Sequence, residues 1–317
     1  MLIPRFGGRD QRVTTAGFQR GFVWNKAQMD RFIESLLLGY PVPGIFLVKQ
    51  SSDNRMLVLD GQQRLITLQS FYEGLHAGRE FRLTNVGDDF QGLTYKTLDE
   101  AQRFQLDDSF LQATILQTDG SPQVDEAIYQ IFERLNSGGT QLTAHEIRVA
   151  LYSGPLVDFI EQLNQTDAWR DLFGKASARI RDHELILRTV ALYLDADKYS
   201  KPLKGFLNGF SKENRTNPPR VQAAGLLFKR ACDLILREAG PSAFKNTHTN
   251  QLNIAQVEAI LVATMRRLET DPEIRELSDK VANIMAHQGF INATTRFTAD
   301  VDAVAERLRI AHEIMDS

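Results

Sequence analysis

The spacing of apolar positions differs between the first and second parts of the chain. Up to about residue 120, short apolar runs bounded by turn residues predict strands at 45–48, 56–59, 81–86 and 111–116. Among them lie two predicted helices, one that follows an Asn25 N-cap and one that runs through Leu65. From Pro122 onward, apolar residues recur every three or four positions, which is typical of amphipathic helices.

Glycine and proline divide the second part into separate helices. The first ends at the Asn-Ser-Gly-Gly stretch 136–139, and Thr143 with Glu146 has the form of a capping box that starts the next. Beyond Gly154, helices are predicted at 156–164, 180–196, 219–238, 255–268, 272–287 and 298–313. The pattern predicts an α+β protein, with a mixed domain over 1–154 and an all-α helical domain over 155–317.

Composition limits the class of protein without naming its function. A chain of 317 residues with 43% hydrophobic content can bury one large core or two smaller ones. Its one cysteine, Cys232, rules out an internal disulfide framework and a four-cysteine zinc site, and is expected to be a small core residue. We find no apolar run long enough to span a membrane and no signal-peptide core, so we expect a cytoplasmic protein without a membrane partner.

The segment Leu-Asp-Gly-Gln-Gln-Arg at 59–64 joins a predicted strand to a predicted helix. Gly61 permits backbone angles that other residues avoid, and the N–H groups at the start of a helix favour an anion. Arg64 offers paired donors to phosphate oxygens, and Asp60 is suited to hold magnesium or to position a water. The alternative is structural, with Asp60 capping the helix and Arg64 paired with a surface carboxylate.

Four segments in this order carry a resemblance to a known family. They are Phe-Gln-Arg-Gly-Phe-Val-Trp at 18–24, Leu-Asp-Gly-Gln-Gln-Arg-Leu at 59–65, the Phe-x-x-Leu-Asn-x-x-Gly-x-x-Leu match at 132–142 and, more weakly, Arg-x-Asp-x-Glu-Leu-x-Leu-Arg near 180–188. Together they make residues 18–190 resemble the family catalogued as domain of unknown function 262. Members include the S part of GmrSD-type restriction systems and the N-terminal part of a phosphorothioate-sensing defence nuclease.

The resemblance implies a fold related to the ParB and sulfiredoxin group, with a nucleotide pocket that binds and hydrolyses nucleoside triphosphates with Mg²⁺. Carried over by position, it implies catalytic roles for Asp60, Gln63 and Arg64. It implies nucleotide binding by Gln19, Arg20, Gly61, Gln62 and Asn136, and metal binding by Asp60 and Asn136. In the family this activity is coupled to DNA restriction.

The histidines depart from what a His-Asn-His nuclease requires. Such a site needs histidines clustered around a metal, whereas the six of this chain are scattered in sequence: His76, His145, His183, His248, His287 and His312. We expect each to be a surface or capping residue. Any DNA cutting is then expected from a partner nuclease.

A basic segment at 198–230 contrasts with the net charge of −3. It holds eight basic residues, Lys198, Lys201, Lys204, Lys212, Arg215, Arg220, Lys229 and Arg230, against Glu213. The interleaved aromatics Tyr199, Phe206 and Phe210 would suit DNA binding by backbone contacts and stacking, with Lys198, Lys201, Lys204, Lys212 and Arg215 as the contacts. The alternative is a solvated loop whose aromatics anchor it to the core.

These observations predict a nucleotide-binding protein, a Mg²⁺-dependent nucleoside triphosphatase, acting in antiphage defence by restriction of modified DNA. The expected partners are a nucleoside triphosphate, DNA and a nuclease subunit, and a homo-oligomer stays open. Two alternatives are a DNA-recognition or adaptor subunit without turnover and a direct DNA endonuclease. Arg181, Asp182 and Glu184 are expected to form an ion-pair network that joins the two domains.

Overall fold

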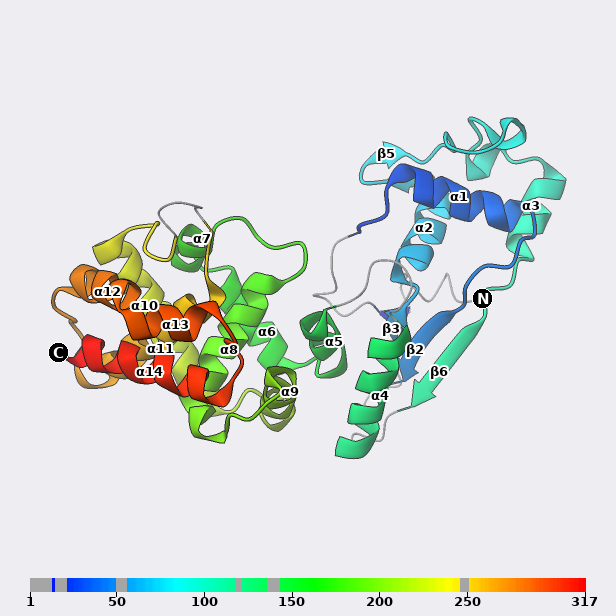
Figure 1. The fold of residues 1–317 in the computed structure, drawn as a ribbon. Coiled ribbons are helices and arrows are strands. Elements are labelled where there is room, and N and C mark those ends of the chain that lie inside the picture. The colour runs from blue at the N-terminus through cyan, green and yellow to red at the C-terminus, as the bar shows by residue number, and fades with distance from the viewer. Residues whose placement is uncertain (1–12, 15–21, 50–55, 118–120, 136–142, 246–250) are drawn as a thin grey trace. The chain divides into compact units, whose positions relative to one another are not determined.

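The computed structural model describes residues 13–14, 22–49, 56–117, 121–135, 143–245 and 251–317. The chain divides into two compact units, a mixed unit over 1–151 and a helical unit over 152–317 (Figure 1). The mixed unit contains a small mixed sheet and helices, and the helical unit is built from helices. The predicted α+β class, with a mixed region followed by a helical one, is therefore confirmed.

The mixed unit alternates short strands with helices. Its elements are β1 (Val13–Thr14), α1 (Lys26–Leu37), β2 (Ile45–Lys49), β3 (Met56–Asp60), α2 (Gln62–Glu73), β4 (Leu75–His76), β5 (Arg79–Glu80), two 3₁₀ turns (Asp88–Phe90 and Tyr95–Thr97), α3 (Glu100–Asp107), β6 (Ala113–Gln117), α4 (Pro122–Leu135) and α5 (Ala144–Leu151). In the described part of the unit, the main sheet has the strand order β1-β3-β2-β6. β1 pairs parallel with β3, β3 antiparallel with β2, and β2 parallel with β6.

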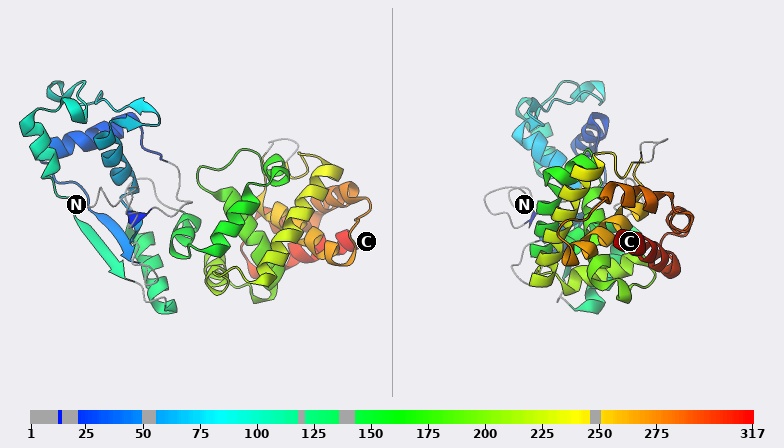
Figure 2. Two further views of the ribbon diagram at one scale, coloured as in Figure 1. Left: turned by 180° about the vertical axis from the view of Figure 1, so that it is seen from behind. Right: turned by 90° about the vertical axis from the view of Figure 1, so that its left-hand side faces the viewer.

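Helices cover both faces of this sheet because its central strands alternate their apolar side chains between the faces. On one face Ile45, Leu47 and Val58 pack against Leu65 of α2. On the other face a separate cluster joins the strands to α4 and α5, and it contains Val48, Leu59, Ile128, Tyr129, Ile147 and Ala150. Figure 2 shows α4 lying along the sheet in the view from behind. The start of α2 is thus fixed by burial of its first apolar residue.

α1 forms as its sequence predicts. The Asn25 side chain accepts a hydrogen bond from the N–H of Gln28, and the Gln28 side chain accepts one from the N–H of Asn25. This reciprocal capping box satisfies two donors at the helix start. Met29, Ile33 and Leu36 then point into a core shared with α2 and α3, which also contains Leu68, Phe71, Phe81, Leu83 and Leu106.

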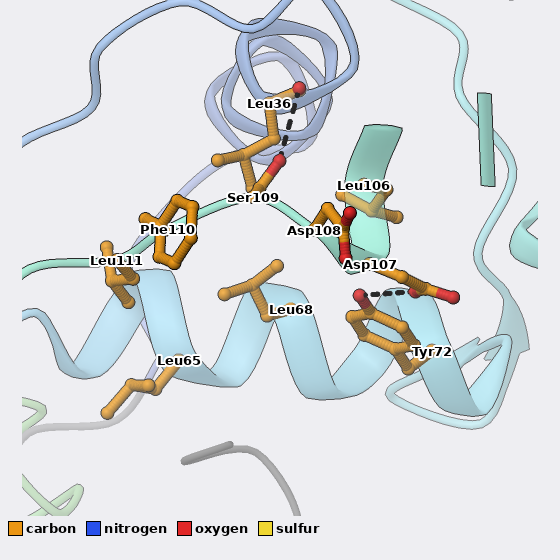
Figure 3. Close-up of a pocket in the computed structure, with 10 residues that line it drawn as sticks. All are labelled: Leu36, Leu65, Leu68, Tyr72, Leu106, Asp107, Asp108, Ser109, Phe110 and Leu111. Atoms are coloured by element: carbon orange, nitrogen blue, oxygen red, sulfur yellow. Dashed lines mark hydrogen bonds between the residues drawn. The ribbon is translucent and has the colours of Figure 1, made fainter. Parts of the chain in front are cut away.

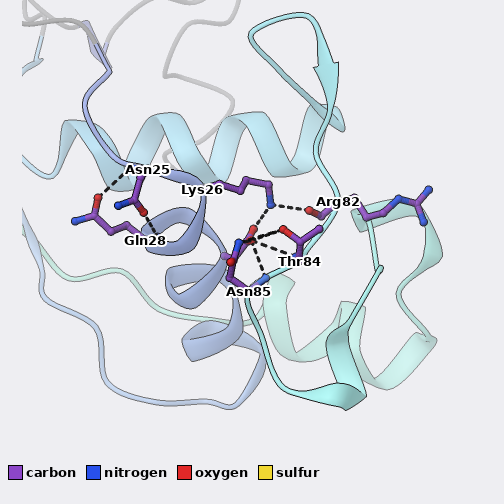
Figure 4. A network of polar contacts seen from close by, with 7 residues as sticks. Asn25, Lys26, Gln28, Arg82, Thr84 and Asn85 are labelled. Carbon is purple, nitrogen blue, oxygen red and sulfur yellow. Dashed lines mark hydrogen bonds and ion pairs between the residues drawn. The ribbon is translucent and has the colours of Figure 1, made fainter.

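The prediction of a strand at 81–86 is wrong, although buried apolar and exposed polar residues do alternate at the start of this segment. Phe81 and Leu83 are buried in the core, but the backbone beside them is held by the buried carboxylate of Asp30. Its partners Lys26, Thr84 and Asn85 are labelled in Figure 4. One oxygen of Asp30 accepts hydrogen bonds from the backbone and side chains of Thr84 and Asn85, at 2.8–3.1 Å. Lys26 contacts the other oxygen and also donates to the carbonyl of Arg82 at 2.6 Å. A side chain here takes the place of a neighbouring strand.

In its described residues, 152–245 and 251–317, the helical unit contains the six predicted helices and three more. Its elements are α6 (Pro155–Asn164), α7 (Asp167–Phe173), α8 (Arg181–Asp195), a 3₁₀ turn (Ala196–Lys198), α9 (Leu203–Glu213), α10 (Pro219–Ala239), α11 (Ile254–Thr270), α12 (Leu277–Ala286), α13 (Gln288–Thr295) and α14 (Val301–Asp316). α7, α9 and α13 were not predicted, and the first and last of these are short. The apolar positions of α7 and α13 are too few for a reliable period, whereas Leu203, Phe206, Leu207 and Phe210 of α9 do have helical spacing that the sequence analysis missed.

α11 lies at the centre of the helical unit and packs against α8, α10 and α14. Its one acidic residue in the buried face, Glu258, is fully buried between two arginines. Arg188 of α8 approaches one carboxylate oxygen at 2.8 Å, and Arg307 of α14, itself buried, contacts the other. Arg307 also donates to the carbonyl of Thr298 at 2.6 Å. This ion triad joins three helices inside an otherwise apolar core.

Cys232 is fully buried in α10, as expected of a small core residue, and burial raises the pKa of its thiol. None of the helices in the described ranges is long and apolar enough to cross a membrane.

Candidate functional site

The predicted turn between a strand and a helix is present at 60–62. β3 ends at Asp60, Gly61 has φ 96° and ψ 7°, and α2 begins at Gln62. A side chain at Gly61 would be strained by this left-handed backbone, and its Cβ would lie 2.3 Å from Cγ2 of Ile45. The freedom of glycine is used to pack the turn directly against β2.

The side chain of Arg64, in the first turn of α2, binds both Asp60 and Gly44. Its Nη2 donates to the carboxylate of Asp60 at 2.7 Å and to the carbonyl of Gly44 at 2.8 Å. The Arg64 side chain is 13% exposed and that of Asp60 is 45% exposed, so the pair lies at the surface with its arginine covered. The structural alternative predicted that Arg64 pairs with a surface carboxylate, and this is confirmed, with Asp60 as the carboxylate.

No side chain among the described residues caps the start of α2. The part of the structural alternative in which Asp60 caps the helix is therefore wrong: the N-cap is Gly61, and the Asp60 carboxylate is bound by Arg64. α1 and α3, in contrast, each begin with a capping box, from Asn25 and Asp99. The first N–H groups of a helix lack intrahelical acceptors, so those of Gln62, Gln63 and Arg64 remain suited to an anion.

Gln63 joins the second family motif to the first. Its side chain is 5% exposed, and its Oε1 accepts hydrogen bonds from the N–H of Val23 at 3.0 Å and of Trp24 at 3.3 Å. This side chain therefore fixes the end of the 18–24 segment on α2. Gln62 is only half-buried. Gln19 and Arg20, earlier in the same segment, lie outside the described residues.

Three buried polar atoms at the start of α2 meet no hydrogen-bond partner in the described part of the chain. They are Nε2 of Gln63, Nε of Arg64 and Oγ1 of Thr67. Buried polar atoms are nearly always paired, so each such exception calls for an explanation. Gln63 and Thr67 are four residues apart and share a face of the helix. Thr67 was not predicted, since an isolated threonine within a helix gives no sequence signal.

Asn136 lies outside the described residues, in the connection between α4 and α5. The helix that follows this connection, α5, packs on the sheet and begins with the predicted capping box. In that box Glu146 accepts from the N–H of Thr143 at 2.6 Å, and Thr143 accepts from the N–H of Glu146 at 3.2 Å.

Asp60 is the carboxylate at this turn that suits a magnesium ion. One of its oxygens is bound by Arg64, which leaves the other for a metal. Magnesium in nucleotide sites is often held by one or two carboxylates together with the phosphates. Within the described ranges, no three histidine, cysteine, aspartate or glutamate side chains come together as a metal site.

The basic segment 198–230 meets carboxylates that its own sequence does not contain. Lys198 donates to Asp195 at 2.8 Å, Arg220 binds the same carboxylate with two nitrogens at 3.0 and 3.1 Å, and Lys201 pairs with Asp300. Hydrogen bonds from Arg220 and Lys198 outweigh the effect of burial and lower the pKa of Asp195. Arg215 donates to the carbonyl of Ser153 at 2.9 Å. Lys204 is exposed on α9, and Nζ of Lys212 is buried without an acceptor among the described residues.

The aromatic residues of this segment are not available for stacking. Tyr199 and Phe210 are buried in the main core of the helical unit, and Phe206 packs against that core. Stacking of bases on Tyr199 and Phe210 is therefore contradicted, and anchoring of the segment by its aromatics is confirmed. Its residues form helices and not the expected loop.

Two histidines and one aspartate also differ from expectation. His145 and His183 are 1% exposed, so the prediction of surface or capping positions is wrong for both, while His287 does cap α13. Asp182 is buried and accepts from Arg170 at 2.7 Å, an ion pair between α7 and α8. This pair lies within the helical unit, so Asp182 does not serve the predicted link between domains.

Comparison with known proteins supports the motif analysis for the mixed unit. Residues 6–153 match the family described as "GmrSD restriction endonuclease, N-terminal domain". No curated protein and no solved structure matches the chain, so the relation to the ParB and sulfiredoxin fold stays a prediction. The matched range contains the 18–24, 59–65 and 132–142 motifs and the whole sheet. Residues 6–153 of this chain belong to the GmrSD restriction endonuclease N-terminal domain family.

Proposed function

We propose that the mixed unit binds a nucleoside triphosphate with Mg²⁺ and hydrolyses it, and that this activity serves the restriction of modified DNA. The observation that carries the proposal is the start of α2, where uncapped N–H groups lie beside the Asp60–Arg64 pair. Such a helix start binds anions, and an adjacent arginine adds charge-assisted hydrogen bonds. Family membership of residues 6–153 supports the restriction context.

Each residue at the turn has a distinct role in this proposal. The N–H groups of Gln62, Gln63 and Arg64 bind phosphate oxygens, and the Arg64 guanidinium meets the charge that develops on the transferred phosphoryl group. The free oxygen of Asp60 binds the metal or orients the attacking water. Magnesium, when bound, neutralises phosphate charge. Gln19, Arg20 and Asn136 remain predicted contributors to the same site.

For Gln63 we propose a positioning role within that chemistry. Its Oε1 is held by two backbone N–H groups, so it orients the 18–24 segment that carries Arg20. Gln63→Glu would place an acceptor-only group at Nε2 while keeping the contacts of Oε1. We expect it to reduce hydrolysis with a smaller loss in nucleotide binding.

Phosphate release and calorimetric binding with Mg²⁺ and each triphosphate test the proposal on the full chain. Asp60→Asn and Arg64→Lys are expected to lower turnover by roughly 100-fold or more, the order seen when one transition-state contact is removed. Arg82→Lys is a matched control, because Arg82 forms an exposed ion pair with Glu80 in the same unit. The absence of triphosphate binding, or unchanged turnover in both variants, would exclude this function.

A second candidate is direct DNA cutting, which the name of the family, a restriction endonuclease domain, favours. Incubation of supercoiled plasmid with Mg²⁺ or Mn²⁺ distinguishes it: an intact supercoiled band assigns cutting to a partner nuclease. A recognition or adaptor subunit without turnover would instead bind modified DNA and release no phosphate. These assays on one protein preparation therefore distinguish triphosphate hydrolysis, DNA cutting and DNA recognition without turnover.

A further inference from the structure

A cavity of about 400 Å³ runs along α2 from the turn that carries the candidate site (Figure 3). Leu65, Leu68 and Tyr72 of α2 form one wall, and Leu36 of α1 closes it from the other side. The remaining wall is the segment 106–111, which leaves α3 and leads into β6. Its size and mostly apolar lining are typical of small-molecule sites.

The residues of α2 that line the cavity follow the candidate phosphate site directly in the sequence. Leu65, at one end of the cavity in Figure 3, directly follows Arg64 in α2. Arg64 donates to the carbonyl of Gly44, and the next residue, Ile45, donates to the carbonyl of Gln112 at 2.8 Å. Gln112 directly follows the cavity wall at 110–111. Leu68 lies about 7.5 Å beyond Gln63 along the helix axis, a span that a ribose and its α-phosphate can bridge.

Phe110 lines the cavity and yet is 96% exposed. A phenylalanine in that state contributes almost no burial to folding, so its ring is available to a ligand. Aromatic side chains at the edge of such sites stack on nucleobases. Phe104 on α3 is also largely exposed, at 68%, but does not line the cavity.

The polar groups of the cavity favour a ligand with N–H donors. Asp107 already accepts from the hydroxyls of Tyr72 at 2.9 Å and Tyr95 at 3.2 Å, and burial together with Asp107 raises the pKa of the Tyr72 phenol. The carboxylate of Asp108 has no hydrogen bond or ion pair with the rest of the described chain. An ionised carboxylate only accepts, and its two oxygens match two adjacent N–H donors.

We propose that this cavity holds the base of the bound nucleotide, with Phe110 stacked on the base and Asp108 accepting from its edge. Guanine presents two adjacent donors, N1–H and the N2 amino group, whereas adenine and the pyrimidines pair a donor with an acceptor. The cavity is therefore assigned as a guanine site. The inference rests on the proposed function, since the same nucleotide places its phosphates at the start of α2.

Calorimetry of the full chain with Mg²⁺ compares guanosine triphosphate with inorganic tripolyphosphate, which has no base. Phe110→Ala is expected to weaken guanosine triphosphate binding roughly tenfold or more, the order of one stacking contact, and to leave tripolyphosphate unchanged. Phe104→Ala, the matched control, changes neither. Because Phe110 is almost fully exposed, its replacement should not alter the thermal midpoint.

Asp108→Asn tests the choice of base. It replaces an acceptor pair with one acceptor and one donor, so the preference for guanosine over adenosine triphosphate should fall at least fivefold. Asp89→Asn, an exposed acid of the same unit outside the cavity, serves as its control.

The outcomes separate the two proposals. If tripolyphosphate and triphosphates bind the native protein but Phe110→Ala and Asp108→Asn behave as the native protein does, the base site is wrong and the phosphate site stands. If native protein binds neither ligand, the proposed function fails and the base site falls with it. Arg64→Lys should weaken both ligands together, because it acts at the phosphates.

Discussion

The start of α2 and the basic segment 198–230 handle charge in opposite ways. At α2 the helix is uncapped, Arg64 shares one nitrogen between Asp60 and a carbonyl, and three buried polar atoms meet no partner in the described chain. In the basic segment, acids from elsewhere in the helical unit bind Lys198, Lys201 and Arg220. A ligand site is therefore better identified by hydrogen-bond donors that lack a partner in the folded protein than by a high local density of charged residues.

Ion pairs between acidic and basic side chains also occur in the core of the helical unit. Glu258 is fully buried and contacts both Arg188 and Arg307, so this buried carboxylate lies beside two groups of opposite charge. Both units expose some large apolar side chains, such as Phe104 and Phe110 in the mixed unit and Phe297 in the helical unit. Both also bury polar atoms that have no hydrogen-bond partner among the described residues, so the difference concerns the start of α2 and not the mixed unit as a whole.

The largest expected effect comes from breaking the triad in the helical unit. Glu258→Ala would leave two arginines in a buried site without their carboxylate, which should lower the free energy of unfolding by about 3–5 kcal/mol. Urea denaturation followed by fluorescence of the buried Trp169 measures this change. Glu313→Ala, which removes an exposed ion pair with Arg309, should cost under about 1 kcal/mol. Equal effects would show that the triad is not a stabilising pair network.

Gly61→Ala should have the next largest effect and act on the mixed unit alone. It combines a left-handed backbone with a Cβ placed against Ile45, for a cost of about 2–4 kcal/mol. Gly74→Ala has a similar φ of 77° but no atom within 4 Å of its Cβ, so it should cost only about 1 kcal/mol. Hydrogen exchange measured by mass spectrometry resolves the two units. A smaller loss at Gly61 than at Gly74 would contradict the packing described for the turn.

Acid should weaken the hold of Asp30 on the 82–85 segment. Burial raises the pKa of Asp30, but hydrogen bonds from Lys26, Asn85 and Thr84 lower it by more, so the net pKa lies below its usual range. The carboxylate therefore stabilises the fold fully above about pH 4 and loses this effect as the pH falls through its folded pKa. Asp30→Asn should cost about 1–3 kcal/mol at pH 7. The difference between Asp30→Asn and native protein should shrink below pH 4 in urea titrations, and a constant difference would refute the ionic role.

The smallest predicted effect has the opposite sign. Lys212 carries a buried Nζ with no acceptor among the described residues, so Lys212→Met should raise the free energy of unfolding by about 1 kcal/mol. Lys201→Met removes an exposed pair with Asp300 and should lower it by about 0–1 kcal/mol. Thermal denaturation compares the two at one pH. If Lys212→Met instead lowers the free energy of unfolding, the Lys212 ammonium makes a favourable interaction, and Lys212 is paired like the other basic residues of the segment.

Predictions from sequence succeeded where neighbours along the chain decide the structure. The N-cap at Asn25, the capping box at Thr143 and the turn at Gly61 depend on residues no more than four apart, and all three are present. The same holds for β2 and β3, whose apolar runs are short and bounded by turn residues. The family motif at 59–65 also identified the candidate site.

Predictions failed where a distant side chain competes for the same group. The 81–86 segment alternates like a strand, yet Asp30, more than fifty residues earlier, binds its backbone. The basic segment suggested a DNA surface, yet Asp195 and Asp300 lie outside it in sequence. Phe110 and Asp108 gave no signal in the sequence, because their place at the cavity depends on α1 and α2, which are distant along the chain.

The sequence by itself determined the α+β order of elements, the strand–turn–helix at Asp60–Gln62 and the family of residues 6–153. These follow from periodicity, capping and motif spacing, which are local properties of the chain. Only the tertiary structure decided that Arg64 binds Asp60, that the basic segment is paired and that a cavity lies beneath Phe110. The reason is physical: pairing and cavity shape depend on which distant groups folding brings within hydrogen-bond and van der Waals range.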